Sequence, residues 1–271
     1  MKNLILLFLF ASLCVSCNSN LLNTDNFQYE KDHVTSPICE QLWESNSKLY
    51  PFIPFTDEEM KVLPYIEKIE RRQIPATYIV GMSTKELFYQ YVACELSGGM
   101  YAYNSAQAGF VAMTKQLNML PALLNRSDAG KVLMELIEKI DLSKLNETEC
   151  FHFYHCLERI LVQPEVIGNM TDDEIDKFIQ IAEHIQETVV RLSKTNENWN
   201  NPESLCAILF GLGNVMLKYE YEPFINLMGS NQDINGLMMG ANLKNQQCIA
   251  LINDCIKNFV KLKNSTQELS L

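Results

Sequence analysis

The sequence predicts an all-α fold, because three observations along the chain all point to helices. Runs that begin with Ser or Thr and carry Glu three positions later occur at Thr56, Ser83 and Thr171, which is the spacing of a capping box. The apolar residues that follow recur every three or four positions, so they share one side of a helix. No stretch alternates apolar and polar residues around a hairpin turn. We expect antiparallel helix pairs stacked as an irregular α-α superhelix, with a compact multi-helix bundle as the alternative.

The first helices follow the boxes at Thr56 and Ser83. Pro64 interrupts or resets the first of them, because proline cannot donate the hydrogen bond that an unbroken helix needs. The apolar side of this part of the chain is predicted to consist of Val62, Ile66 and Ile69.

The stretch 103–141 is predicted to form two helices joined by a turn. Asn104 and Gln107 have the spacing of an N-cap residue and its N3 partner, and Pro121 bends or restarts the chain. Asp128 begins the second helix of the pair, where its charge suits the positive end of the helix dipole. Each helix has one apolar side, so the two must face each other or their neighbours.

Four longer helices complete the prediction. The first opens at Asn146 and ends before Pro164, and the second starts at the capping box of Thr171. The third begins at 201–203 and runs through Leu217, because proline is favoured in the first turn of a helix. The last carries an apolar side made of Cys248, Ile252, Cys255, Phe259 and Leu262.

Four short segments carry a resemblance to known proteins. They are RQIP at 72–75, STKEL at 83–87, AYNSAQAGF at 102–110 and RSDAGKVLMEL at 126–136. Together they resemble a helical module of uncharacterised secreted and lipid-anchored proteins from Bacteroides-type bacteria. The resemblance implies a bacterial origin and an all-α module; it implies no activity and no functional residues, because that family has no assigned activity.

The charge of the chain argues against a nucleic-acid partner. Lys and Arg number 22 against 33 Asp and Glu, a net charge of −11, and no cluster of basic residues offers a local exception. With 47% hydrophobic residues in 271, the chain can bury a substantial core.

The N-terminus has the features of an export signal. Lys2 precedes an apolar run at 4–10 that is too short to span a bilayer. The junction 13–17, Leu-Cys-Val-Ser-Cys, resembles a bacterial lipobox in which Cys17 is the lipidated residue; ordinary cleavage with an incidental Cys17 is the alternative. In the lipoproteins that the junction resembles, a non-acidic residue such as Asn18 after the acceptor fits transfer to the outer membrane. The predicted divisions are a signal peptide at 1–16, a lipid-anchored tether at 17–36, one helical domain at 37–264 and a tail at 265–271.

Seven cysteines follow Cys17, so at least one of them has no disulfide partner within the monomer. The densest group of possible metal ligands includes His152, His155 and Cys156, which share one side of a predicted helix. A metal site or a thiol–imidazole pair are two interpretations, and packing of buried side chains is the third. The signal for chemistry is weak, because no HExxH motif and no second Cys/His group accompany it. We therefore predict no catalytic residue, no metal site and no cofactor.

One interpretation of the stretch 220–242 is a long loop, since it contains three glycines and Pro223. Its Met228, Met238 and Met239 side chains are candidates for contact with an apolar partner. The interpretation that we favour is a partly helical segment that closes the core. The function predicted from the whole sequence is a lipid-anchored binding or scaffold module of the cell envelope, exported and held at the bacterial outer membrane. An envelope hydrolase with a cleft between helices is the alternative, and its G-x-S-x-G motif is absent.

Overall fold

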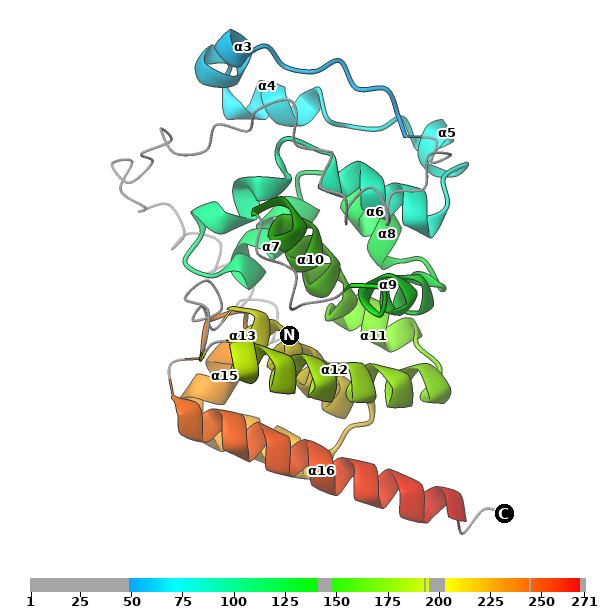
Figure 1. The fold of residues 1–271 in the computed structure, drawn as a ribbon, viewed down its shortest axis with the longest axis vertical. Helices are drawn as coiled ribbons and strands as arrows, with labels where there is room; N and C mark the ends of the chain where they lie inside the picture. The colour runs from blue at the N-terminus through cyan, green and yellow to red at the C-terminus, as the bar shows by residue number, and fades with distance from the viewer. Residues whose placement is uncertain (1–48, 141–147, 193, 195–202, 244, 269–271) are drawn as a thin grey trace, which may run out of the picture. The chain divides into compact units, whose positions relative to one another are not determined.

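The computed structural model describes residues 49–140, 148–192, 194, 203–243 and 245–268. All of them belong to one compact unit, Val34–Leu271. Within these ranges every regular element is a helix, so the all-α prediction is confirmed (Figure 1). The elements are α3 (Asp57–Val62), α4 (Tyr65–Glu70), α5 (Ala76–Ile79), α6 (Thr84–Val92), the 3₁₀ helix η2 (Ser97–Ala102), α7 (Ala106–Thr114), α8 (Met119–Leu124), α9 (Ala129–Ile137), α10 (Thr148–Leu161), α11 (Pro164–Asn169), α12 (Asp172–Leu192), α13 (Glu203–Lys218), α14 (Glu222–Ser230), α15 (Gln232–Met238) and α16 (Gln246–Glu268).

Capping boxes start three of these helices where the sequence predicts them. The Thr56 and Ser83 side chains accept a hydrogen bond from the N3 backbone, and the N3 glutamate side chain accepts one from the cap backbone in return. Thr171 and Glu174 make the same exchange at the start of α12, at 2.8 and 3.3 Å. Each box satisfies two backbone N–H groups that a helix N-terminus would otherwise leave without a partner.

The first described residues form an extended leader, Leu49–Thr56, that precedes α3. The backbone N–H of Tyr50 donates to Oε1 of Gln90 on α6 at 2.6 Å, and the Tyr50 ring packs edge-on against Tyr78. The guanidinium of Arg72 lies 3.8 Å from the ring centroid of Phe55. These contacts hold the leader against α5, α6 and the end of α4.

The predicted apolar side of α3 and α4 is wrong at two of its three positions. Ile69 is buried, whereas Val62 is 69% exposed and Ile66 is 63% exposed. Pro64 explains the difference, because α3 stops at Val62 and α4 restarts at Tyr65, so the spacing across the break no longer follows one helical face.

The central stretch contains three helices, α7, α8 and α9, where the sequence predicted two. The helix is interrupted before Pro121, at Asn118, whose side chain binds the backbone of Ile74. It accepts a hydrogen bond from the Ile74 N–H at 3.0 Å and donates one to the Ile74 carbonyl at 2.7 Å. The N-cap of α7 is Ser105 and not Asn104; its hydroxyl accepts from the N–H of Ala108 at 3.1 Å and donates to the Gly240 carbonyl. Ser105 therefore links the start of α7 to the end of α15.

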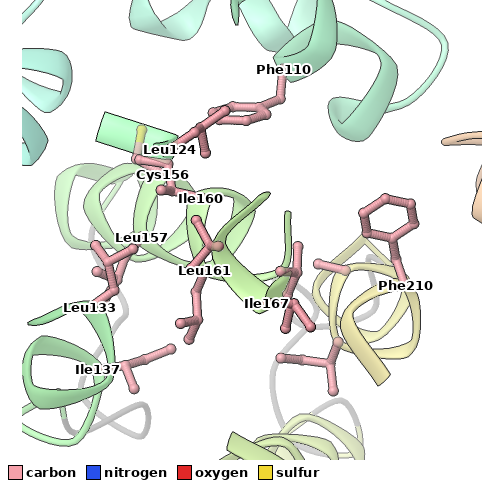
Figure 2. Close-up of a cluster of buried hydrophobic side chains, with 14 of the residues drawn as sticks. Phe110, Leu124, Leu133, Ile137, Cys156, Leu157, Ile160, Leu161, Ile167 and Phe210 are labelled. Carbon is pink, nitrogen blue, oxygen red and sulfur yellow. The ribbon is translucent and has the colours of Figure 1, made fainter. Parts of the chain in front are cut away.

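Helix α10 runs through the core between the N-terminal and C-terminal helices. It packs against α6, α9, α11 and α13. Figure 2 shows Leu157, Ile160 and Leu161 pointing into an apolar cluster that Phe110, Ile137 and Phe210 also enter from other helices. The cluster is part of one contiguous core that extends from Ile69 to Phe259.

Helix α13 is the centre of the C-terminal half. It packs against α10, α11, α12, α14, α15 and α16. In a superhelix each repeat contacts mainly its neighbours in sequence, whereas one helix surrounded by six others is the arrangement of a bundle. The compact bundle, the alternative to the expected superhelix, therefore describes this half.

The stretch 220–242 consists of two helices, α14 and α15, which agrees with the partly helical interpretation and not with a long loop. Pro223 lies in the first turn of α14, where its missing N–H costs no hydrogen bond, and Asn231 caps α15 by accepting from Asp233 and Ile234. Phe224, Ile234 and Leu237 join the core. None of the helices in the described part of the chain is long and apolar enough to cross a membrane.

Candidate functional site

The candidate site is a polar cluster on α10, buried inside an otherwise apolar core. It contains two histidines, a thiol, a carboxylate and a guanidinium on adjacent turns of the helix. Glu158 and Arg159 are 0% and 1% exposed, which is rare for charged side chains unless they are paired. The buried polar and thiol side chains of α10 are His152, Tyr154, His155, Cys156, Glu158 and Arg159.

His152 pairs with a serine from another helix. Its Nε2 lies 2.9 Å from the hydroxyl of Ser97 in η2, and its ring packs edge-on against Tyr101 with centroids 6.0 Å apart. The Cys156 sulfur lies 3.5 Å from the same Nε2 atom. This places a thiol, an imidazole and a hydroxyl within reach of one another at the junction of α10 and η2.

His155 faces the next turn of the helix. Its Nδ1 lies 3.5 Å from Oε2 of Glu158, and the Tyr154 hydroxyl donates to Oε1 of Glu158 at 3.0 Å. The Oε2 atom of Glu158 and the Nε atom of Arg159 form no hydrogen bond with any residue that the structure describes. A buried polar atom without a hydrogen bond costs free energy. This turn of α10 therefore buries polar atoms that packing of the core alone would not require.

Arg159 and Gln163 tie α10 to two other helices. Arg159 donates from Nη2 to the Glu203 carbonyl at the start of α13 at 2.9 Å. The Gln163 and Gln107 side-chain amides donate to each other at 3.0 and 3.2 Å, which joins the end of α10 to α7. Gln107 is therefore a buried partner of Gln163 and not the N3 residue of a capping box.

Burial keeps both members of the thiol–imidazole pair neutral. It lowers the pKa of His152 to about 4, and the neighbouring His155 adds to the effect. Burial also raises the pKa of Cys156 far above its ordinary value, helped by Cys94 nearby. A nucleophilic cysteine needs the opposite shifts, since the thiolate is the reactive form and a protonated imidazole stabilises it. At neutral pH the pair therefore lacks the thiolate–imidazolium form that a nucleophilic cysteine needs.

The three residues predicted as weak metal candidates divide into two sets. His152 and Cys156 lie together beside Ser97, whereas Nδ1 of His155 faces Glu158. Within the described ranges, no three His, Cys, Asp or Glu residues are grouped as metal ligands would be.

Comparison with protein-family models, with curated proteins and with solved structures found no match. The resemblance to Bacteroides-type lipoproteins therefore stays a prediction from four short segments.

A shallow groove of about 290 Å³ lies between the end of α9 and the middle of α12. An ion pair between Lys177 and Glu138 at 2.8 Å stands at this groove. The remaining lining residues are Ile137, Ile140, Gln180, Ile181, His184 and Ile185.

The methionines predicted as partner contacts differ in exposure. Met239 is 80% exposed at the end of α15, whereas Met228 and Met238 are half-buried and pack against the core. The predicted lipidation residue Cys17, with the signal peptide and the tether, lies outside the described residues.

Sequence reasoning found the two histidines and Cys156 but missed Ser97, Glu158 and Arg159. Ser97 lies 55 positions before His152, so no local spacing predicts their contact. Glu158 and Arg159 resemble ordinary surface residues of a helix in the sequence. A usable signal was their position, because both fall on the same turn as Leu157 and Ile160, two residues of the predicted apolar side.

Proposed function

We propose that this protein is a lipid-anchored component of the bacterial cell envelope, held at the outer membrane, whose helical body acts as a binding or scaffold module. The observation that carries the proposal is the junction at 13–17, where small Ser16 precedes Cys17 a few residues after the apolar run at 4–10. Acyl chains on Cys17 would supply the attachment, because each buried CH₂ group contributes about 0.8 kcal/mol of membrane affinity.

The polar cluster on α10 is consistent with a structural role in a rigid helical domain that binds partners through its surface. Its hydrogen bonds run between α10 and η2, α7 and α13, and its side chains are buried, so it positions helices relative to one another. A hydrolase is not proposed, since the serine–histidine pair that the structure brings together, Ser97 and His152, is only 2% and 8% exposed. Substrate needs access to a nucleophile, and this pair offers little.

Metabolic labelling with an alkyne-bearing fatty acid tests the proposal in cells that express the full chain. We expect the wild-type chain and a Cys14→Ser variant to carry the label and to sediment with membranes. A Cys17→Ser variant should lose the label and leave the membrane fraction. Cys14 is the matched control, because it lies three positions away in the same junction. A wild-type chain without label, or a Cys17→Ser variant that keeps it, would refute the proposal.

A further inference from the structure

Apolar side chains are exposed together at the turn between α3 and α4. This turn, Val62–Ile66, is called the elbow below. Val62, Tyr65 and Ile66 are 69%, 49% and 63% exposed, and Pro64 between them is also exposed. Single exposed apolar residues are common on proteins, but a group confined to one turn is typical of a contact surface.

The elbow is held in place by its neighbours and is not a frayed end. Arg71 on α4 pairs with Glu59 on α3 at 2.7 Å, and Lys68 donates to the Met60 carbonyl, so the two helices close on each other. The Tyr65 hydroxyl donates to Oε1 of Gln116 at 2.7 Å, which fixes α4 to the end of α7. The fold therefore presents Val62 and Ile66 outward from a defined frame.

The elbow lies at the end of the helical unit that also holds the first described residues. In Figure 1 the leader, α3 and α4 lie together at one end of the described helices, and α16 lies at the other. Leu49, the first described residue, is 32 positions after Cys17. A fully extended chain of that length spans roughly 110 Å, which is the largest distance that can separate Leu49 from a bilayer holding Cys17.

The charge around the elbow permits contact with a lipid surface. Between Asp57 and Arg72 five carboxylates stand against four cationic side chains, in a protein whose net charge is −11. A nearly neutral segment is repelled by the anionic groups of a membrane surface less than the rest of this acidic chain is.

We propose that the elbow contacts the interface of the bilayer to which the chain is anchored, with Val62 and Ile66 inserted among the lipids and Tyr65 at the headgroup level. The inference rests on the proposed lipid anchor. Two aliphatic side chains bind lipid weakly by themselves, but a tether raises their effective concentration at the surface and makes a weak contact persistent. Aliphatic tips beside a tyrosine are the composition that membrane interfaces favour.

Photo-crosslinking to lipid tests the contact without using the native anchor. The chain Asn18–Leu271 with an N-terminal hexahistidine is bound to phosphatidylcholine vesicles that contain nickel-chelating lipid and a phosphatidylcholine with a diazirine in its acyl chain. After illumination, mass spectrometry locates the modified peptides. We expect modification to concentrate on the elbow and to fall about tenfold in Val62→Ser/Ile66→Ser, the ratio that ~1.4 kcal/mol of lost apolar burial gives.

Met239→Ser is the matched control, because Met239 is 80% exposed directly after α15, and the change should leave the modification of the elbow unchanged. Circular dichroism should show that both variants keep the wild-type helix content. Equal modification of many surfaces, or an unchanged signal in the elbow variant, would overturn the proposal. Crosslinks between two protein copies through the elbow, without lipid crosslinks, would also overturn it. Since nickel lipid replaces the acyl group, the outcome does not depend on whether Cys17 is acylated in cells.

Discussion

The guanidinium of Arg72 forms a two-point ion pair with Glu95 while it stacks on the ring of Phe55. Nε and Nη2 lie 2.7 and 2.9 Å from the two Glu95 oxygens, and Arg72 is 1% exposed. Arg72 thus joins the leader, the end of α4 and the loop after α6 through one side chain. Planar geometry lets arginine pair and stack at once, which lysine cannot do.

Replacing Arg72 should loosen this end of the protein. We expect Arg72→Ala to lower the free energy of unfolding by about 2–3 kcal/mol, because it removes a buried guanidinium that both pairs with the partly exposed Glu95 and stacks on Phe55. Urea denaturation followed by circular dichroism measures the change. Arg71→Ala is the control: its pair with Glu59 is exposed, so the loss should stay below about 1 kcal/mol. Equal losses in the two variants would contradict the role assigned to Arg72.

The buried amide pair of Gln107 and Gln163 should show strong coupling. We expect Gln107→Leu alone to cost about 1–3 kcal/mol, because it leaves buried polar atoms of Gln163 without their partner. Changing both residues to Leu should cost less than the sum of the two single changes. A double-mutant cycle of unfolding free energies gives the coupling, and additive losses would show that the two amides act independently.

Acid should destabilise the protein through His152. Burial lowers the pKa of this histidine from the ordinary 6.5 to about 4, so the unfolded chain binds more protons between these values. Its contribution to stability is therefore fully present above pH 6.5 and decreases by about 3 kcal/mol as the pH falls to 4. Unfolding free energies measured at pH 7 and pH 4.5 should differ less in His152→Gln than in the wild type. His184→Gln, at an exposed position, should keep the wild-type difference.

Two glycines should respond oppositely to alanine. A Cβ on Gly109 of α7 would lie 2.0 Å from the carbonyl oxygen of Met100, so Gly109→Ala must force α7 away from η2. We expect a loss of at least about 3 kcal/mol, in the range of strong overpacking. A Cβ on Gly168 of α11 would meet nothing within 4 Å, and Gly168→Ala should raise stability by about 0.5–1 kcal/mol through helix propensity. Thermal denaturation separates the two; a stable Gly109→Ala protein would contradict the close packing of α7 on η2.

The helix starts could be predicted from the sequence because capping is local. Thr56, Ser83 and Thr171 each have their partner three positions away, so the pattern is complete within four residues. Glycine and proline were less informative at 220–242. Pro223 and Gly229 suggested a loop, yet both are accommodated near the ends of α14.

Contacts across the fold could not be predicted in the same way. Gln107 and Gln163 are 56 positions apart, and Ser105 reaches Gly240 across 135. Helical periodicity indicates which apolar residues share a face of a helix, but not which face is buried in the fold. Val62 and Ile66 were therefore expected to be buried, whereas both are exposed. Sites whose residues come from distant parts of the sequence, including the cluster on α10, could therefore be identified only from the structure.

The most direct test of the proposed anchor is the mass of the N-terminal peptide from protein purified out of the membrane fraction. The account predicts that this peptide begins at Cys17 and carries several fatty acyl chains. A mature N-terminus at Cys17 without any acyl group, or a chain that still begins at Met1 and is found in the cytosol, would contradict it.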